Sequence, residues 1–145
     1  MYKEFGIQMD VLISQYPYVM EYKDITAEGL IKLKKYELAY PYLLKRFTAE
    51  QNAFSAKWLG IISLLQKKND DALFYLSKSR EMSGSDPQVL FNLATALVYQ
   101  KKYTLAFEEL KRCLSIKPDY PGAQKLYRLL EKVIRSKKNV VLNLE

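Results

Sequence analysis

The stretch YQKKYTLAFEELKRCLSIKPDYP, residues 99–121, decides the fold because its opening pattern recurs along the chain. Paired lysines stand 33 and then 34 residues apart, at Lys34 and Lys35, Lys67 and Lys68, and Lys101 and Lys102. Small residues keep the same step: Ala27, Gly60 and Ala94 precede the lysines, and Ala39, Ala72 and Ala106 follow them. Such a period, with small side chains where two helices approach closely, predicts an array of helical hairpins.

Two helices are expected within residues 87–120. Apolar side chains recur at helical spacing on both sides of the QKKY interruption, at Leu90, Leu93, Ala94 and Leu97 and again at Leu105, Ala106, Leu110, Cys113 and Leu114. The segment KPDYP ends the second helix, because proline has no amide hydrogen and restricts the residue before it. Asp86 and Asp70 are candidate N-caps for the helices near them.

This pattern resembles the tetratricopeptide (TPR) repeat. The family's order of a large residue, leucine with a small residue, a bulky residue, alanine and a closing proline is matched at Leu90, Leu93, Ala94, Leu97, Ala106, Leu110 and Pro118. The unit at 53–86 matches through Leu59, Gly60, Ala72 and Leu76, and the unit at 20–52 matches least well. The resemblance implies an all-α fold, a right-handed superhelical solenoid of antiparallel helix pairs.

The repeat also predicts how a single domain, 1–145, is divided. We expect repeat units at 20–52, 53–86 and 87–120, an amphipathic capping helix at 121–136 and a frayed tail at 137–145. Residues 2–17 superimpose on 103–118 without a gap, which predicts an amino-terminal helix that is half of an incomplete unit in a longer array. The alternative is an ordinary amphipathic helix that covers one end of the stack.

The composition indicates a folded protein and argues against several kinds of catalytic site. Apolar residues make up 49% of the chain and charged residues 27%, as in soluble globular proteins. Histidine is absent, which removes the usual general base, the common triads and the histidine-containing metal sites. The five glycines stand singly, so the sequence holds no phosphate-binding loop. We therefore expect a protein that is not an enzyme, with no catalytic residue, metal or cofactor.

Two further observations concern location and the single cysteine. No apolar run approaches the roughly 20 residues that span a bilayer, and the amino end lacks the pattern of a signal peptide, which together predict a cytoplasmic protein. Cys113 has no partner for an internal disulfide. Its place in an apolar helical pattern predicts a small core residue.

The resemblance implies a binding surface, since in the family the first helix of each pair lines the concave side of the superhelix. The candidate groove residues are Phe54, Lys57, Trp58, Ile61, Phe91, Asn92, Thr95, Tyr99, Lys125 and Leu129, and Leu65, Val98, Leu126 and Val133 are expected to face the same way. An apolar surface of this kind is typical of an interaction site, because each large side chain left in water forgoes roughly 1.5–3 kcal/mol.

Three occupants of this groove are open at the level of sequence. It can accept an apolar or amphipathic segment of another protein, it can be covered by the chain's own amino-terminal helix or tail, or it can be buried in a homodimer. Trp58 is the expected anchor, because a buried aromatic side chain contributes a large contact area at a low entropic cost. The alternative for Trp58 is simple core packing between helices.

Some TPR modules grip the carboxyl terminus of a partner with lysine, asparagine and arginine side chains. Lys57 and Asn92 match that set, but Ile61, Gly122 and Leu126 stand where further polar or basic groups are required, with Lys125 as a substitute cation. The sequence therefore predicts that this chain is not a clamp for chaperone tails.

The paired lysines predict a basic edge, because stacked hairpins place equivalent turns in a row. This edge would consist of Lys34, Lys35, Lys67, Lys68, Lys101 and Lys102, and it accounts for much of the net charge of +7. One interpretation is a footprint for nucleic acid or an anionic membrane surface. We instead expect solvated lysines that complement helix carboxyl ends, with neither nucleic acid nor a membrane as the partner.

The expected function is that of a non-catalytic scaffold or adaptor that binds another protein or peptide segment in the apolar groove. One alternative is a small TPR chaperone that shields apolar secretion substrates. Another is a helical interaction domain of a larger enzyme. The fold itself does not separate these alternatives, because one fold carries many functions.

Overall fold

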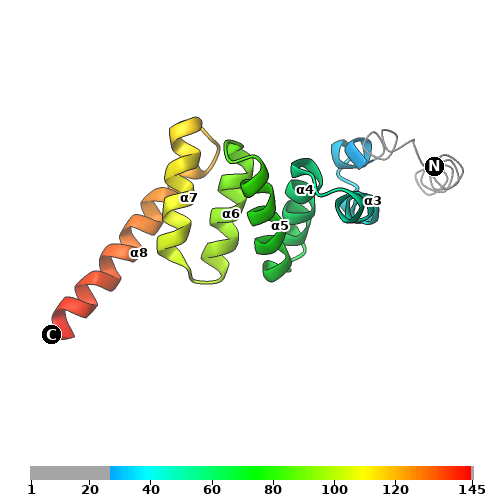
Figure 1. Ribbon diagram of the computed structural model, residues 1–145. Helices are drawn as coiled ribbons and strands as arrows, with labels where there is room; N and C mark the ends of the chain where they lie inside the picture. The colour runs from blue at the N-terminus through cyan, green and yellow to red at the C-terminus, as the bar shows by residue number, and fades with distance from the viewer. Residues whose placement is uncertain (1–26, 145) are drawn as a thin grey trace, which may run out of the picture.

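The computed structural model describes residues 27–144, and the regular elements in that range are helices (Figure 1). Residues 27–32 are helical, and they are followed by α3 (Tyr36–Ala49), α4 (Ala53–Leu65), α5 (Asn69–Met82), α6 (Pro87–Tyr99), α7 (Tyr103–Ile116) and α8 (Ala123–Leu144). From α3 to α8, each helix packs against its neighbours in the chain, and α4 also contacts α6. Packing between neighbours is the arrangement of a solenoid, which confirms the predicted all-α fold of antiparallel pairs.

Side-chain caps fix where α4 and α6, the first helices of two successive pairs, begin. Asn52 precedes α4 and accepts a hydrogen bond from the Ser55 amide at 2.8 Å. Asp86 precedes α6 and accepts one from the Gln88 amide at 3.0 Å, as the sequence predicts. Asp70 is not an N-cap, because α5 already begins at Asn69. Its carboxylate instead accepts a hydrogen bond from Gln100 Nε2 at 2.7 Å, which ties α5 to the end of α6.

The paired lysines form the same tight turn each time they occur. Lys34, Lys67 and Lys101 have positive φ angles of 57°, 60° and 59°, a region that glycine occupies more readily than other residues. In the second turn the Lys67 amide donates to the Leu64 carbonyl and the Lys68 amide to the Ser63 carbonyl, and the other two turns repeat this pair of bonds. This is the Schellman pattern that ends a helix by satisfying its last carbonyls.

The small residues of the repeat let the paired helices approach closely. A methyl group added to Gly60 would stand 2.5 Å from Leu76 Cγ and 3.0 Å from the Leu76 backbone nitrogen, so α4 and α5 meet where only glycine fits. Ala72 and Ala106 are fully buried at the equivalent approach in α5 and α7. The core therefore depends on backbone contact as well as on large side chains.

Two apolar clusters fill the space between the helices. One extends from Ala27 to Ile62 and the other from Ile61 to Leu130, and Trp58 packs against both. Cys113 is fully buried in the second cluster, as the sequence predicts, and its thiol donates a hydrogen bond to the Pro87 carbonyl oxygen.

The carboxyl-terminal helix is longer than the sequence pattern indicates. A capping helix at 121–136 and a frayed tail at 137–145 were expected, but α8 begins at Ala123 and continues to Leu144. No proline or glycine follows Gly122 to end it. Lys137 also holds its Nζ 4.6 Å from the centre of the Tyr103 ring, a contact that a frayed tail would not keep.

Several expectations fall outside the described residues or concern absences within them. The amino-terminal helix expected at 2–17 and the start of the unit at 20–52 lie before residue 27. Among the helices that the structure describes, none combines the length and the apolar character that crossing a bilayer requires. Over the same residues, no cluster of three or more His, Cys, Asp or Glu side chains is arranged to hold a metal ion.

Candidate functional site

The predicted groove residues lie on the first helices of successive pairs, α4, α6 and α8. The structure brings α4 and α6 into direct contact, so their side chains form one surface. Side chains in the earlier turns of α4 and α6 make contacts within the protein, whereas the side chains at the C-terminal ends of these helices are exposed.

Lys57, near the start of α4, is already paired. Its Nζ lies 2.7 Å from Asp86 Oδ2, and only 19% of the Lys57 side chain and 28% of the Asp86 side chain are exposed. The same carboxylate caps α6, so the ion pair ties two successive first helices together. Lys57 is therefore a structural cation in this structure rather than one directed at a ligand.

The polar groove residues of α6 are also engaged. Asn92 donates from Nδ2 to the Gln88 carbonyl at 2.8 Å, and the Thr95 hydroxyl donates to the Phe91 carbonyl at 2.9 Å. Both bonds stay within one helix and leave the side chains half-buried. With Lys57 paired as well, the two residues that match the carboxylate-gripping set are each used inside the protein.

The aromatic residue of this region, Phe91, packs against the loop that leads into α8. Its ring centre lies 5.1 Å from that of Tyr120, and a Cβ on Gly122 would touch it at 3.5 Å. Burial raises the pKa of the Tyr120 hydroxyl, with smaller contributions from Cys113 and Asp86. The contact joins α6 to the loop that precedes α8.

Three α4 residues of the candidate groove are partly or fully enclosed. Ile61 has 7% of its surface exposed and belongs to the core, so it has little area to present to a partner. Trp58 and Phe54 are half-buried and pack on the core clusters. Core packing, the alternative considered for Trp58, therefore describes much of its contact area.

The C-terminal ends of α4 and α6 expose apolar side chains, and so does the first half of α8. Leu65 ends α4 and is 60% exposed, Tyr99 ends α6 and is 62% exposed, and Val133 and Leu129 of α8 are 36% and 51% exposed. Lys125 is exposed on the first turn of α8. We call Leu65, Tyr99, Leu129 and Val133 the apolar row.

The apolar row was only partly recognised from the sequence. Tyr99 and Leu129 were among the candidate groove residues, whereas Leu65 and Val133 were expected only to face the same way. Leu65, Tyr99 and Val133 are 34 residues apart, so each holds the same place in its unit. That exact step was the available sequence signal for these three residues, although it does not show that they are exposed.

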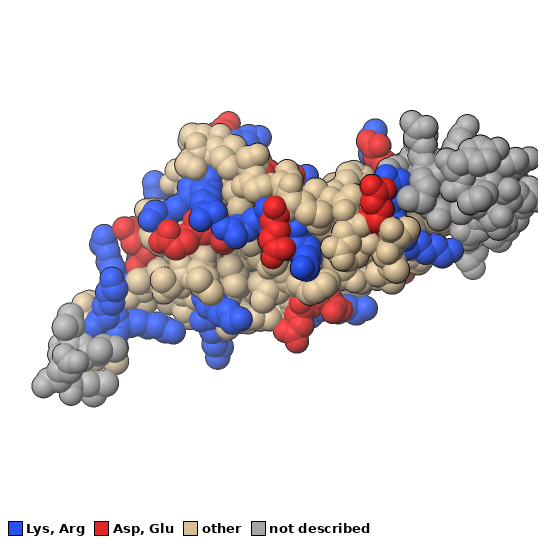
Figure 2. All heavy atoms as spheres, in the orientation of Figure 1, with Lys and Arg blue, Asp and Glu red and all other residues tan. Residues whose placement is uncertain are grey.

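The lysines of the predicted basic edge are all exposed. The α4–α5 and α6–α7 turns lie on the same side of the stack in Figure 1, and the repeated backbone geometry makes the three turns equivalent. Hollows adjoin the first and third of these turns, at residues 34–38 and 101–105. In Figure 2, Lys and Arg occur without Asp or Glu along the lower edge at the α8 end.

Comparison with known proteins identifies the fold. No protein-family model matches the sequence, and no curated protein matches it. Among solved structures, a crystal structure of MamA matches with a TM-score of 0.80 at 14% identity, covering 97% of this chain and 82% of that chain. The TPR domain of Arabidopsis OM64 gives 0.72 at 16% identity, covering 79% and 96%.

A third similar structure is the second TPR domain of human RPAP3 in complex with the HSP70 peptide SGPTIEEVD. Its TM-score is 0.69 at 19% identity, covering 80% of this chain and 98% of that chain. At these identities the likeness establishes architecture. The chain is an all-helical repeat protein with the fold of TPR domains, as its sequence pattern predicts.

Proposed function

We propose that this protein is a non-catalytic interaction scaffold that holds an apolar or amphipathic segment of another protein against the apolar row. The observation that carries the proposal is the exposure of Leu65, Tyr99 and Val133 at one repeat position of three successive first helices. Peptide binding by similar TPR domains, such as the RPAP3 domain with its HSP70 peptide, supports a protein partner.

The chemistry of the apolar row favours an apolar contact with a polar margin. Covering a leucine or valine side chain stabilises a complex by roughly 1.5–3 kcal/mol when burial is complete. Tyr99 adds a large ring whose hydroxyl can stay in water at the rim, which suits a tyrosine at an interface. Lys125 lies at one end and favours a partner with acidic groups beside its apolar ones.

A grip on a carboxyl-terminal tail is the competing mode, because the similar RPAP3 domains hold HSP70 and HSP90 peptides. In this chain Lys57 is paired with Asp86 and Asn92 is bonded to its own helix. A tail carboxylate would have to displace a half-buried ion pair, which is costly when the remaining charge is left without a partner. We expect the peptide SGPTIEEVD not to bind.

The test is site-specific photo-crosslinking with the crosslinker at position 99, followed by mass spectrometry that maps the attached partner segment. The segment is then made as a peptide, and its affinity is measured for three proteins. These are the native chain, a Leu65→Ser, Tyr99→Ser variant, and a matched control, Phe74→Ser, Met82→Ser, whose residues are comparably exposed on α5.

An apolar or amphipathic segment that loses affinity only for the Leu65→Ser, Tyr99→Ser variant supports the proposal. Equal affinity for both variants contradicts it. Sedimentation velocity separates the homodimer, since a native dimer that the row variant converts to a monomer would make the row a self-association surface. A tail-dependent interaction, abolished by amidating the peptide's carboxyl terminus, would favour the competing mode.

A further inference from the structure

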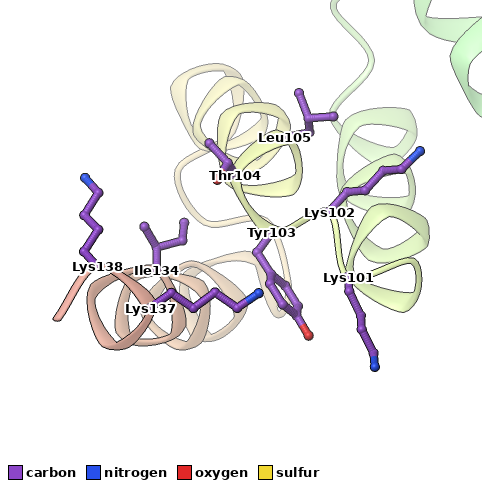
Figure 3. A pocket seen from close by; sticks show the side chains of 8 residues that line it. All are labelled: Lys101, Lys102, Tyr103, Thr104, Leu105, Ile134, Lys137 and Lys138. Carbon is purple, nitrogen blue, oxygen red and sulfur yellow. The ribbon is translucent and has the colours of Figure 1, made fainter. Parts of the chain in front are cut away.

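A second site adjoins the apolar row at the turn between α6 and α7. A hollow of about 370 Å³ lies between the start of α7 and the second half of α8 (Figure 3). It is lined by Lys101, Lys102, Tyr103, Thr104, Leu105, Ile134, Lys137 and Lys138. Half of its lining residues are therefore lysines, contributed by two separate segments of the chain.

These four lysines are not neutralised by the protein. No ion pair joins any of them to an Asp or Glu within residues 27–144. Two nearby acids are bonded elsewhere: Asp70 accepts from Gln100, and Glu131 pairs with Arg135 at 3.1 Å. The hollow is thus a concentrated positive site whose natural complement is an anion.

The equivalent turns are better balanced. Thr104 follows the lysines of the third turn at the place where Glu37 and Asp70 follow those of the first and second. On a larger scale, residues 101–144 contain eleven Lys and Arg against four Asp and Glu, whereas residues 1–100 contain twelve against eleven. Nearly all of the net charge of +7 therefore belongs to the part of the chain that forms the hollow.

The arrangement of the side chains indicates what kind of anion fits. In Figure 3 the four ammonium groups point in different directions around the hollow, so a compact single phosphate could not meet them together. An extended chain of anionic groups could meet them in turn. Leu105 of α7 and Ile134 of α8 add apolar side chains on opposite sides of the hollow, with Leu105 58% exposed.

Nucleic acid fits this surface less well than an acidic peptide. Single-stranded nucleic acid gains affinity by stacking bases on free aromatic faces. The aromatic ring in the hollow, Tyr103, already has the Lys137 ammonium over it at 4.6 Å. An apolar lining residue such as Ile134 also has no role against a sugar-phosphate backbone, whereas it can receive an apolar side chain that interrupts a run of acidic residues.

We infer that the hollow between α7 and α8 binds an internal acidic peptide segment that carries an apolar side chain among its Asp and Glu residues. The carboxylates meet Lys101 and Lys102 on one wall and Lys137 and Lys138 on the other. The apolar side chain packs on Ile134. This site is separate from the apolar row, so either one can fail without the other.

The experiment measures fluorescence anisotropy of a labelled peptide, EEDLEEDLEE, blocked at both ends so that no terminal carboxylate takes part. Two variants remove the charges, Lys101→Gln with Lys102→Gln, and Lys137→Gln with Lys138→Gln. Each should weaken binding roughly three- to ten-fold, as expected for the loss of two exposed ion pairs. The matched control, Lys67→Gln with Lys68→Gln, changes the same charge at the equivalent turn and should change affinity less than about two-fold.

Companion measurements decide the chemistry of the ligand. The peptides QQNLQQNLQQ and EEDAEEDAEE should both bind more weakly than the parent, and the Leu65→Ser, Tyr99→Ser variant should bind the parent normally. Equal binding of the glutamine peptide, or an equal loss in the control variant, would overturn the inference. So would tighter binding of duplex DNA or phosphatidylserine vesicles that is lost in the same two variants.

Discussion

A lysine adopts a left-handed backbone conformation at each turn between paired helices. Within residues 27–144, no contact of its side chain compensates for that conformation. Lys67 is exposed and has a φ of 60°. A residue with a Cβ pays roughly 1 kcal/mol for that region relative to glycine. The strain recurs at Lys34 and Lys101, so it is a repeated property of the turn.

Lys67→Gly should therefore raise the free energy of unfolding by about 0.5–1 kcal/mol, because glycine relieves the strain at the turn. Urea unfolding monitored by circular dichroism measures the change. The neighbouring substitution Lys68→Gly is the control, since Lys68 has a φ of −91° and glycine there only adds freedom to the unfolded chain. If both substitutions lower stability, the left-handed lysine is not strained.

Gly60→Ala should lower the free energy of unfolding by about 1–3 kcal/mol, because the added methyl group would overlap Leu76, including its backbone nitrogen at 3.0 Å. A side chain could rotate away, but the backbone of α5 could not. Urea unfolding provides the measurement.

Gly29→Ala is the matched control for this prediction. Gly29 is also helical, but nothing lies within 4 Å of its added Cβ. Alanine should stabilise the helix there by about 0.5–1 kcal/mol. A Gly60→Ala protein as stable as the native chain would mean that α4 and α5 can separate freely.

Among single residues that join elements, Asp86 has two roles, since it caps α6 and pairs with Lys57 of α4. Asp86→Ala removes both and should cost about 1–2 kcal/mol of stability, the upper part of the range for losing a cap. Asp86→Asn keeps a capping oxygen and should cost less. Thermal or urea unfolding of the two variants measures the difference, and equal losses would show that the ion pair, not the cap, carries the effect.

The helical hairpins could be predicted from the sequence because their signals are local and repeated. Lysine pairs and small residues recur near 34 residues, and the N-cap at Asp86 sits directly before Pro87. The extent of α8 could not be predicted in the same way. The absence of proline and glycine after Gly122 permits a longer helix, and its second half also contacts Tyr103 through Lys137, a pair far apart in sequence.

The candidate groove was harder to predict than the helices. The sequence pattern correctly predicted which helices lie side by side. Which of their side chains stay exposed depends on contacts with other parts of the fold. Lys57 pairs with Asp86, Phe91 packs against Tyr120, and Ile61 is buried in the core. Exposure remained at the helix ends, where no following element covers Tyr99 or Leu65 within the described residues. Repeat position alone therefore identifies a surface but not its accessible part.

For the whole molecule, the two apolar clusters meet where α4 packs closely against α5. Trp58, the single tryptophan, packs on both, and the Lys57 to Asp86 ion pair crosses from α4 to α6. In a repeat array, stability is approximately a sum of units and nearest-neighbour interfaces, so such connections decide whether the array unfolds as one. We expect them to couple the two clusters.

Cys113 and Trp58 together test this coupling. Burial raises the pKa of the Cys113 thiol, which disfavours the reactive thiolate, so native protein should react with a thiol reagent only after α6 and α7 open. The urea midpoint of Cys113 labelling should equal the urea midpoint of the shift in Trp58 fluorescence. Labelling at clearly lower urea would show that the C-terminal pairs open independently.

The raised thiol pKa has a small effect on stability at alkaline pH. The unfolded chain loses the Cys113 proton first as pH rises, so this contribution is complete below the ordinary pKa of a thiol and is lost above it.

The concentration of positive charge in residues 101–144 makes the charge of the helix stack uneven, with the positive end at α7 and α8. In the field of an acidic partner such a molecule is turned before the two surfaces touch, with α8 leading. Orientation of this kind raises the rate of encounter more than it strengthens the final contact. Added salt should therefore slow the approach of such a partner while leaving its departure nearly unchanged.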